Sequence, residues 1–460
     1  MSDRTGVYIL SERQENKMGV MPVGKLLVNM STPMMLSMLT QALYNIVDSI
    51  FVAMISEKAL TAVSLAFPLQ TLMIAFAIGT GVGVNALVSR HLGAREFDKA
   101  NEIATTGVRL SFVTYVVFAL FITLCCRPFF RFQTADTEIV EAGIIYMQIV
   151  GVLSIGMFFQ SMMEKLLQAT GKTSLSMTTQ IVGAVINMIM DPILIFGYFG
   201  FPKMGIAGAA TATIFGQIVA GLLALYFNKT KNTEIQISMK KYPFKLETVQ
   251  KIYAIGVPSI IMQAIGSVMT FGFNKILIVF SATATALFGV YFKLQSFVLM
   301  PVFGLNNGMM PIVAYNYGAR KPERIVKTMK LSYGAAYVIM IVGVVVFWVI
   351  PDKLLMMFSA SEDMIEIGVP ALKIISLHFL LAPFSIVSSS FFQALGHGFI
   401  SMINSIIRQL LVLLPAAFIL SRLIGLSAVW WSFPIAELAA VAMAAFFMIR
   451  VYNKEIKPLF

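Results

Sequence analysis

Charged side chains are scarce in this sequence, at 12% of its 460 residues, whereas an ordinary soluble domain carries about 25%. So few charges could not cover the surface of a water-soluble globule of this size. The chain is 58% hydrophobic, and its apolar residues come in runs such as 110–126 and 206–227. Runs of roughly 20 residues match the thickness of a bilayer core. The sequence therefore excludes a soluble globular protein and predicts a membrane protein.

The sequence also lacks the period-two alternation of polar and apolar residues that marks a membrane β-barrel. Only closed barrels and helices satisfy every backbone hydrogen bond inside lipid, so the spans must be helices. We expect an all-α polytopic protein with twelve transmembrane helices. They lie near residues 26–55, 61–88, 102–126, 138–162, 172–198, 205–227, 252–280, 284–314, 329–350, 365–388, 398–421 and 426–449.

Several functional signatures are missing. The only two cysteines, Cys125 and Cys126, are adjacent in an apolar span, which excludes a disulfide framework or a cysteine-rich metal site. There is no Walker-type glycine loop, so direct coupling to ATP has no support. The motifs H-E-x-x-H and G-x-S-x-G are absent too, and we expect neither an enzyme nor a cofactor. Because the first 20 residues are polar, we expect no cleavable secretory signal.

The chain carries a net charge of +12, and the placement of its basic residues explains the excess. The N-terminal segment, every second connection and the tail together hold 23 Lys and Arg residues, whereas the opposite connections hold six. By the positive-inside rule, both termini and the middle loop are cytoplasmic. The excess is therefore a topology signal. We expect a multi-pass protein of a prokaryotic plasma membrane, in contact with lipid, with no nucleic-acid partner.

A shift of 225 residues aligns the chain with itself. The matches are Pro33 with Pro258, Leu69-Gln70 with Leu294-Gln295, Gly93-Ala94-Arg95 with Gly318-Ala319-Arg320, Gln168-Ala169 with Gln393-Ala394, Gly171 with Gly396, and Ser176-Met177 with Ser401-Met402. A single offset that recurs across each half indicates a duplication.

Each half holds six spans, so both halves enter the membrane in the same direction and should be related by a pseudo-twofold axis along the membrane normal. Parallel repeats of this kind are a transporter architecture, with the substrate site between the halves. We expect an N-terminal lobe over 26–227 and a C-terminal lobe over 252–449, joined by a cytoplasmic linker at 228–251. Cytoplasmic segments at 1–25 and 450–460 would flank the two lobes.

Few ionisable residues remain at membrane depth once the connections are set aside. The acids are Asp48, Asp191 and Glu437, and the bases are Arg109, Lys275, Lys293, Lys373 and Arg408. A charge at a helix centre costs roughly 2.5–3.5 kcal/mol on insertion scales, so a midplane acid is a candidate functional residue. Glu437 has no polar stripe beside it, and its role stays open. Lys293 and Arg408 could bind anionic groups or offset a carboxylate.

Two helical faces carry a polar stripe. Gln41, Tyr44 and Asn45 precede Asp48 by seven, four and three residues, which places all four on one face of the first span. Asn187 precedes Asp191 by four residues in the fifth span, and Pro192, which follows at once, frees a carbonyl one turn back. Such oxygens are ligands for a hard cation, and the same carboxylates could carry a proton instead. Alternatively, the acids only join neighbouring helices.

Motifs along the chain resemble those of the multidrug and toxic compound extrusion (MATE) transporters. The resemblance rests on Pro33…Gln41…Asn45-Ile46-Val47-Asp48, Ala66-Phe67-Pro68, Gly81-Val82-Gly83, Ser89-Arg90-His91-Leu92-Gly93-Ala94, Gln168-Ala169-Thr170-Gly171, Asn187-x-x-x-Asp191-Pro192, Gly205-Ile206-Ala207-Gly208-Ala209-Ala210-Thr211-Ala212-Thr213, Pro301…Gly304-Leu305 and Asn316-Tyr317-Gly318-Ala319-Arg320. It spans nearly the whole chain, and it implies a two-lobed fold of twelve helices and drug efflux coupled to inward H⁺ or Na⁺ movement.

The resemblance also implies a coupling site. In the branch that couples through the N-terminal lobe, the matching positions are Asp48, Asn187, Asp191 and Thr213, with Thr211 as a rival to Thr213; the same four would hold Na⁺. A second branch relies on acids in the seventh and eighth helices. Here the seventh shows only Thr270, Asn274 and Lys275, and the eighth has no acid, so the N-terminal lobe is favoured.

We therefore expect a monomeric secondary antiporter that exports lipophilic, cationic drug-like compounds in exchange for H⁺ or Na⁺. Gln41, Tyr44, Asn45, Thr211, Lys293 and Arg408 are candidate polar residues of its cavity. The 31 methionines would suit a wall that repacks around different ligands, although plain core packing explains many of them. The alternative is a flippase for lipid-linked saccharides or another exporter of the same superfamily, whose anionic substrate would need several arginines in the cavity.

Overall fold

The protein is described by a computed structural model that covers residues 15–358 and 360–460. Residues 1–14 of the predicted N-terminal segment lie outside the described residues. Over the described ranges the chain is helical and contains no strand. In the same ranges, ten helices are each long and apolar enough to cross a membrane, and two bent helix pairs complete twelve spans. The predicted all-α fold with twelve spans is confirmed.

The first half contains six spans, preceded by the short helix α1 (Lys17–Val20). They are α2 (Val23–Ala53), α3 (Glu57–Gly93), α4 (Phe97–Gln133), the pair α5 (Thr137–Val152) and α6 (Ile155–Ala169), α7 (Thr173–Phe196), and α8 (Ile206–Thr230), with the turn η2 (Tyr198–Gly200) between the last two.

The second half repeats this order. Its spans are α9 (Leu246–Leu277), α10 (Ala282–Gly318), α11 (Pro322–Val349), the series α13 (Glu362–Ser376), η3 (Leu377–Leu380) and α14 (Ala382–Leu395), the series α15 (Gly398–Ile406), η4 (Ile407–Leu413) and α16 (Leu414–Leu423), and the pair α17 (Leu426–Val429) and α18 (Ser432–Val451). Short elements are α12 (Pro351–Met356), η5 (Tyr452–Ile456) and η6 (Lys457–Leu459).

The duplication is visible in local backbone structure. Ser56 caps α3 by accepting a hydrogen bond from the Ala59 amide, and Ser281 caps α10 in the same way. Gly171 and Gly396 both have left-handed φ angles, of 84° and 95°, a conformation that favours glycine. The fourth span bends by 44° between α5 and α6, and the tenth bends by 45° before α14. Capping residues, turns and bends thus recur at equivalent positions.

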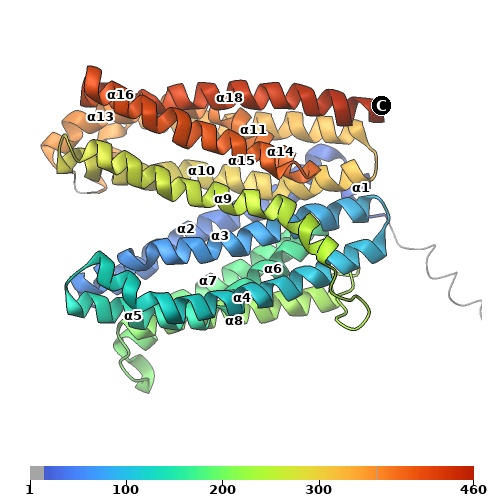
Figure 1. Ribbon diagram of the computed structural model, residues 1–460, viewed down its shortest axis with the longest axis horizontal. Helices are drawn as coiled ribbons and strands as arrows, with labels where there is room; N and C mark the ends of the chain where they lie inside the picture. The colour runs from blue at the N-terminus through green and yellow to red at the C-terminus, as the bar shows by residue number, and fades with distance from the viewer. Residues whose placement is uncertain (1–14, 359) are drawn as a thin grey trace, which may run out of the picture.

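The two halves form two lobes that meet along α2, α3, α9 and α10 (Figure 1). Helix α2 packs against α10, and α3 packs against α9, which is the same contact generated twice by the pseudo-twofold symmetry. Gly93 of α3 and Gly318 of α10 lie at a third contact, between α3 and α10. A Cβ on Gly93 would collide with the Tyr315 carbonyl, and one on Gly318 with the Arg90 carbonyl. Glycine is required at both positions by this contact.

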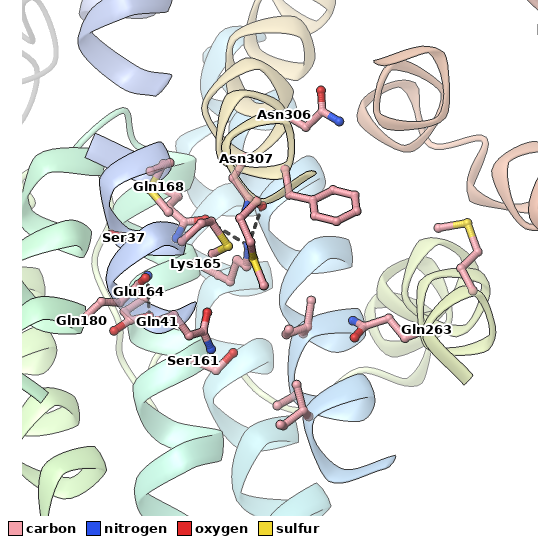
Figure 2. A pocket seen from close by; sticks show the side chains of 18 of the residues that line it. Ser37, Gln41, Ser161, Glu164, Lys165, Gln168, Gln180, Gln263, Asn306 and Asn307 are labelled. Carbon is pink, nitrogen blue, oxygen red and sulfur yellow. Dashed lines mark hydrogen bonds between the residues drawn. The ribbon is translucent and has the colours of Figure 1, made fainter. Parts of the chain in front are cut away.

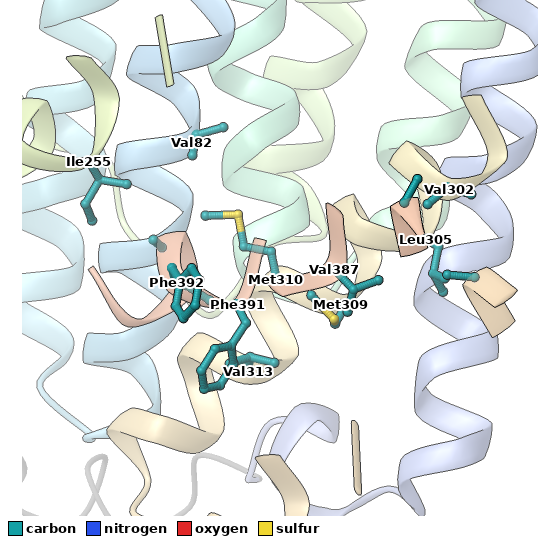
Figure 3. Close-up of a cluster of buried hydrophobic side chains, with 14 of the residues drawn as sticks. Val82, Ile255, Val302, Leu305, Met309, Met310, Val313, Val387, Phe391 and Phe392 are labelled. Atoms are coloured by element: carbon teal, nitrogen blue, oxygen red, sulfur yellow. The ribbon is translucent and has the colours of Figure 1, made fainter. Parts of the chain in front are cut away.

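Apolar side chains from both lobes fill the region around α10. The buried cluster joins α3, α9, α10 and α14, and Figure 3 shows Val82, Ile255, Val302, Leu305, Met309, Met310, Val313, Val387, Phe391 and Phe392 within it. Most membrane-facing side chains remain exposed at the outer surface of the bundle, for example Leu124 and Phe271, because lipid rather than water is their solvent.

The linker between the lobes packs against α4. Asp98 and Glu102 form ion pairs with Lys241 and Lys245, at 3.0 Å and 2.7 Å. Arg109 donates a hydrogen bond of 2.7 Å to the Met239 carbonyl. Arg109 was expected at membrane depth, and this contact instead places its guanidinium at the linker end of the span.

The fourth span extends further than the sequence predicted. Helix α6 continues to Ala169, whereas the expected span ended near residue 162. Glu164 and Lys165 were therefore assigned to a connection, and this assignment was wrong, because both side chains are buried inside the bundle. Removing Lys165 from the count of basic connections leaves the charge asymmetry intact.

Candidate functional site

Three helices of the N-terminal lobe bring the predicted coupling residues together. Asp48 comes from α2, Asn187 and Asp191 from α7, and Thr213 from α8. The carboxyl groups of Asp48 and Asp191 lie close enough to interact. The Asn187 amide donates a hydrogen bond of 3.3 Å to the Thr213 hydroxyl. The i, i+4 spacing of Asn187 and Asp191 puts both on the inner face of α7, where both are buried.

Four amide and carboxylate oxygens of this cluster accept no hydrogen bond from a donor group. Among the described residues, no amide, hydroxyl or basic side chain donates a hydrogen bond to Asp48 Oδ1, to Asn187 Oδ1 or to either oxygen of Asp191. The carboxyl groups of Asp48 and Asp191 face each other, and they can share a hydrogen bond only when one of them carries a proton. Burying such atoms without a partner is costly. A proton on a carboxylate or a hard cation held by the oxygens would satisfy them, and the set of two carboxylates, an amide and a hydroxyl fits Na⁺ as well as H⁺.

Two tyrosines lie near the acids. Tyr44, one turn before Asp48, interacts electrostatically with both carboxylates. Tyr146 of α5 does so as well, and its hydroxyl accepts a hydrogen bond of 3.0 Å from the Gln70 amide. Tyr44 was predicted from the polar stripe on α2. Tyr146 and Gln70 were missed, since neither has another polar residue three or four positions away to mark a polar helical face.

A cavity of about 760 Å³ lies between the lobes. Its wall combines amides, hydroxyls and flexible apolar side chains from both halves. Lining residues include Met34, Met38, Gln41, Tyr44, Asn45, Met157, Asn187, Thr213, Met262, Gln263, Met300, Phe303, Asn306, Asn307, Gln393, Arg408 and Gln409. Asn187 and Thr213 therefore belong both to the coupling cluster and to the cavity wall, whereas Asp48 and Asp191 lie behind that wall.

The candidate cavity residues divide into two groups. Gln41, Tyr44, Asn45 and Arg408 line the cavity. Thr211 and Lys293 do not. The Thr211 hydroxyl donates to the Ala207 carbonyl of its own helix at 2.7 Å, and Lys293 is exposed, with its ammonium 5.8 Å from the centre of the Phe358 ring.

Glu437 has partners in the C-terminal lobe. The buried Glu437 carboxylate accepts hydrogen bonds from the Ser385 hydroxyl and, at 3.3 Å, from the Arg408 guanidinium. Arg408 lies in the π-helical segment η4. The sequence left the role of Glu437 open, and these contacts favour a structural one.

Two adjacent charged residues that are buried in the N-terminal lobe, Glu164 and Lys165, were not among the predicted site residues. Glu164 accepts hydrogen bonds from Gln160, Thr179 and Gln180, and Lys165 donates to Gln168 and Asn307 (Figure 2). Gln160, Glu164 and Gln168 are spaced four residues apart, so a polar stripe on α6 could have revealed them. Both charged residues line the cavity.

A duplicated bundle whose lobes enclose one cavity, with buried acids beside it, has the architecture of a membrane transporter. The MatE family model matches the chain twice, over residues 33–193 and again over 258–419. The chain belongs to the MATE family, as its motifs predicted. The double match also reproduces the internal repeat.

Relatives and solved structures agree over almost the whole chain. The multidrug export protein MepA of Staphylococcus haemolyticus is 27% identical over 431 residues, which cover 94% of each chain. MepA of Staphylococcus aureus is 26% identical, with 93% of this chain and 94% of its own covered. An outward-facing multidrug resistance MATE family transporter of the MOP superfamily superimposes with a TM-score of 0.90 at 26% identity, covering 97% and 98% of the chains. This protein is accordingly a multi-span membrane transporter of a multidrug export family.

Proposed function

We propose that the protein is a secondary active antiporter that exports lipophilic, cationic compounds in exchange for H⁺ or Na⁺ by alternating access. The observation that carries the proposal is the set of unpartnered oxygens on Asp48, Asn187 and Asp191, beside the cavity between the lobes. A bound proton or Na⁺ would remove the cost of burying these oxygens. No reaction is needed for this cycle, and we propose a transporter without enzymatic activity or a cofactor.

Coupling follows if the coupling ion and the substrate favour different conformations. Each ligand can shift the equilibrium only by its differential affinity for the two states. Asn187 and Thr213 line the cavity and belong to the acid cluster. A substrate in the cavity therefore contacts the same side chains that complete the ion site, which supports competition between the two ligands.

The cavity wall suits flat, lipophilic cations. Met34, Met38, Met157, Met262 and Met300 can repack around ligands of different shape, and the Phe303 ring can hold a cationic group on its face. We further propose that the transporter acts as a monomer.

The basic connections support an orientation in the membrane. The linker, the C-terminus and α1 lie at one end of the bundle (Figure 1). By the positive-inside rule this end faces the cytoplasm of a prokaryotic cell, and export then runs from this end to the other.

The test is transport by purified protein in proteoliposomes. We expect accumulation of a fluorescent lipophilic cation, such as ethidium, when a pH gradient or a Na⁺ gradient is imposed across the membrane, and none when an ionophore collapses that gradient. The gradient that drives transport identifies the coupling ion. Failure of both gradients to drive any cation would contradict the proposal and would favour a flippase for lipid-linked anions.

A further inference from the structure

The connection between α7 and α8 carries an exposed aromatic cluster. Its nine residues, 197–205, include Tyr198, Phe199 and Phe201 and contain no acidic residue. The three side chains are 55%, 89% and 49% exposed, so the described residues cover little of their apolar surface. Contiguous exposed apolar side chains of this kind indicate contact with a partner or with a membrane.

The backbone holds this connection in a compact loop. The amides of Met204 and Gly205 donate hydrogen bonds of 3.0 Å and 3.1 Å to the Leu194 and Ile195 carbonyls, which closes the base of the loop on the last turn of α7. Phe199 has a left-handed φ angle of 56°, a strained conformation for a bulky side chain. The loop therefore presents its rings in a fixed arrangement, although no other part of the described chain packs over Phe199.

The loop projects sideways from the bundle. Figure 1 shows it in light green below α5, at the end of the bundle opposite the linker, and the connection between α4 and α5 extends further toward that end. The spans run along the membrane normal, so a sideways projection at this level leads into the boundary of the lipid layer rather than into bulk water.

The outer surface of α7 and α8 is continuous with the loop. Val185 and Ile189 of α7 and Phe215 of α8 are exposed, and none of them lines the cavity. They therefore face lipid. Membrane proteins gather aromatic side chains where such a surface meets the headgroups, and a lysine there can extend its ammonium to lipid phosphates. Lys203, which is exposed in the loop, supplies that ammonium.

The second lobe lacks this loop. Its corresponding connection, between α16 and α17, consists of Ile424 and Gly425 and contains no aromatic residue. The loop thus belongs to the lobe that carries the acid cluster. Asp191 lies on α7 six residues before Gly197, and Thr213 lies on α8 beyond the loop. Any contact that fixes the depth of the loop also fixes the depth of these two helices.

We propose that residues 197–205 form an interfacial membrane anchor. The rings of Tyr198, Phe199 and Phe201 insert between the phospholipid headgroups and the acyl chains of the leaflet at that end of the bundle, and they set the depth of α7 and α8. The partner of this surface is the lipid itself. The inference goes beyond the proposed function and depends on neither the coupling ion nor the exported compound.

The first test measures the depth of the loop with a nitroxide spin label. Cys125→Ala/Cys126→Ala removes the native thiols, and Phe199→Cys then carries the label in the full chain, reconstituted into nanodiscs of phosphatidylcholine and phosphatidylglycerol. The control is Glu57→Cys in the same background, because Glu57 is exposed at the same end of the same lobe. Oxygen concentrates in lipid and a nickel chelate stays in water, so power saturation in electron paramagnetic resonance distinguishes the two environments.

We expect the ratio of oxygen to nickel accessibility to be several times higher for the label at position 199 than for the label at position 57. Equal ratios would show that the loop lies in water. Protection of position 199 from both reagents would show that protein covers it. Either of these results would overturn the inference.

A second test asks whether the rings set the depth of α7. Ile189→Cys, in the background without native thiols, places the label on the lipid-facing side of α7, and the protein is reconstituted with short-chain or long-chain phosphatidylcholine. With the native loop we expect the same accessibility ratio in both bilayers, because an anchored helix follows the headgroups. Tyr198→Ser/Phe199→Gly should make the ratio depend on bilayer thickness.

The choice of variants separates anchoring from misfolding. Glycine suits the left-handed backbone at position 199, so Phe199→Gly removes the ring without straining the loop. Phe199→Trp keeps an interfacial ring and should behave as the native loop does. A ratio that stays constant in Tyr198→Ser/Phe199→Gly, or one that already varies with the native loop, would contradict the assigned role in setting helix depth.

Discussion

The two lobes share one architecture, but the carboxylates of Asp48 and Asp191 in one lobe and of Glu437 in the other differ in their hydrogen-bond partners. In the N-terminal lobe, one oxygen of Asp48 and both oxygens of Asp191 accept no hydrogen bond from an amide, hydroxyl or basic side chain within the described residues. In the C-terminal lobe, Glu437 accepts hydrogen bonds from Arg408 and Ser385. The first arrangement can take up a proton or a cation, whereas the second is already neutralised. This contrast supports the proposal that ion coupling resides in the N-terminal lobe, with the C-terminal pair in a structural role.

The duplicated positions sharpen this contrast. An offset of 225 residues places Phe273, Val412 and Ala416 at the positions of Asp48, Asn187 and Asp191. Phe273 is fully buried and packs against Phe288, with ring centres 4.6 Å apart, and against Phe433 at 5.1 Å. Where one lobe holds buried carboxylate and amide oxygens, the other holds apolar side chains. At these three positions the C-terminal lobe therefore has no counterpart of the acid cluster.

The largest effect should come from removing an acid of the N-terminal cluster. Asp191→Asn, which keeps the shape and removes the charge, should reduce gradient-driven ethidium transport to the level of protein-free vesicles, because the coupling ion loses its main ligand. Transport in proteoliposomes is the measurement. The control is Glu141→Gln, which removes an exposed acid of the same lobe. Normal transport by Asp191→Asn would place coupling elsewhere.

Breaking the C-terminal pair should affect stability more than coupling. Arg408→Gln leaves Glu437 buried without its cation and should lower the free energy of unfolding by about 3 kcal/mol. The double variant Arg408→Gln/Glu437→Gln removes both charges and should recover most of that loss. Thermal or denaturant unfolding in detergent checks both variants. If the double variant were as unstable as the single one, the pair would not be the cause of the loss.

Substituting two threonines on α8 in turn should show which of them belongs to the ion site. Thr213→Ala removes the hydroxyl that contacts Asn187, and we expect the affinity for the coupling ion to fall by about fivefold, the effect of one hydrogen bond of roughly 1 kcal/mol. Thr211→Ala removes a hydroxyl bonded only to its own helix and should leave the affinity unchanged. The dependence of the transport rate on ion concentration distinguishes the two. A larger effect of Thr211→Ala would assign the site to the rival residue.

The smallest effect is expected where the start of α3 contacts the loop and first turn that begin α5. Lys58 pairs with Asp136 at 3.1 Å and with Glu138 at 2.7 Å, and the ammonium holds the pKa of Asp136 below its usual value. Stabilisation from a lowered carboxyl pKa is present above the ordinary pKa and is lost as the pH falls through the lowered one. Because the pair is exposed, Lys58→Ala should change the melting temperature by no more than about 1 °C at neutral pH, and the difference should vanish in acid. A large shift would show that the loop is energetically important.

Much of this molecule could be predicted from its sequence. Long apolar runs determine the number of spans, since lipid permits only helices there, and the repeat of Gly93 and Gly318 marks the two halves. Asp48 could be assigned because Gln41, Tyr44 and Asn45 repeat with the period of a helix. Asn187 and Asp191 were found through the same period, and the family motif added Thr213.

Other contacts could not be predicted, for physical reasons. Hydropathy ends a span at the first charged residues, so Glu164 and Lys165 were placed in a connection, although their amide and hydroxyl partners allow them to be buried. The Arg408–Glu437 contact joins two helices whose relative rotation depends on packing and on the π-helical turn at Arg408. No spacing along one helix encodes such a contact.

The most direct test of the N-terminal coupling site is the release of a coupling ion when substrate binds. Because linkage between two ligands is reciprocal, ethidium added to the ion-loaded, detergent-solubilised protein should displace the ion. A pH indicator records released H⁺, and a Na⁺ electrode records released Na⁺. The account predicts stoichiometric release from the native protein and from Arg408→Gln/Glu437→Gln, and none from Asp191→Asn. Release that persists in Asp191→Asn and disappears in the double variant would contradict it.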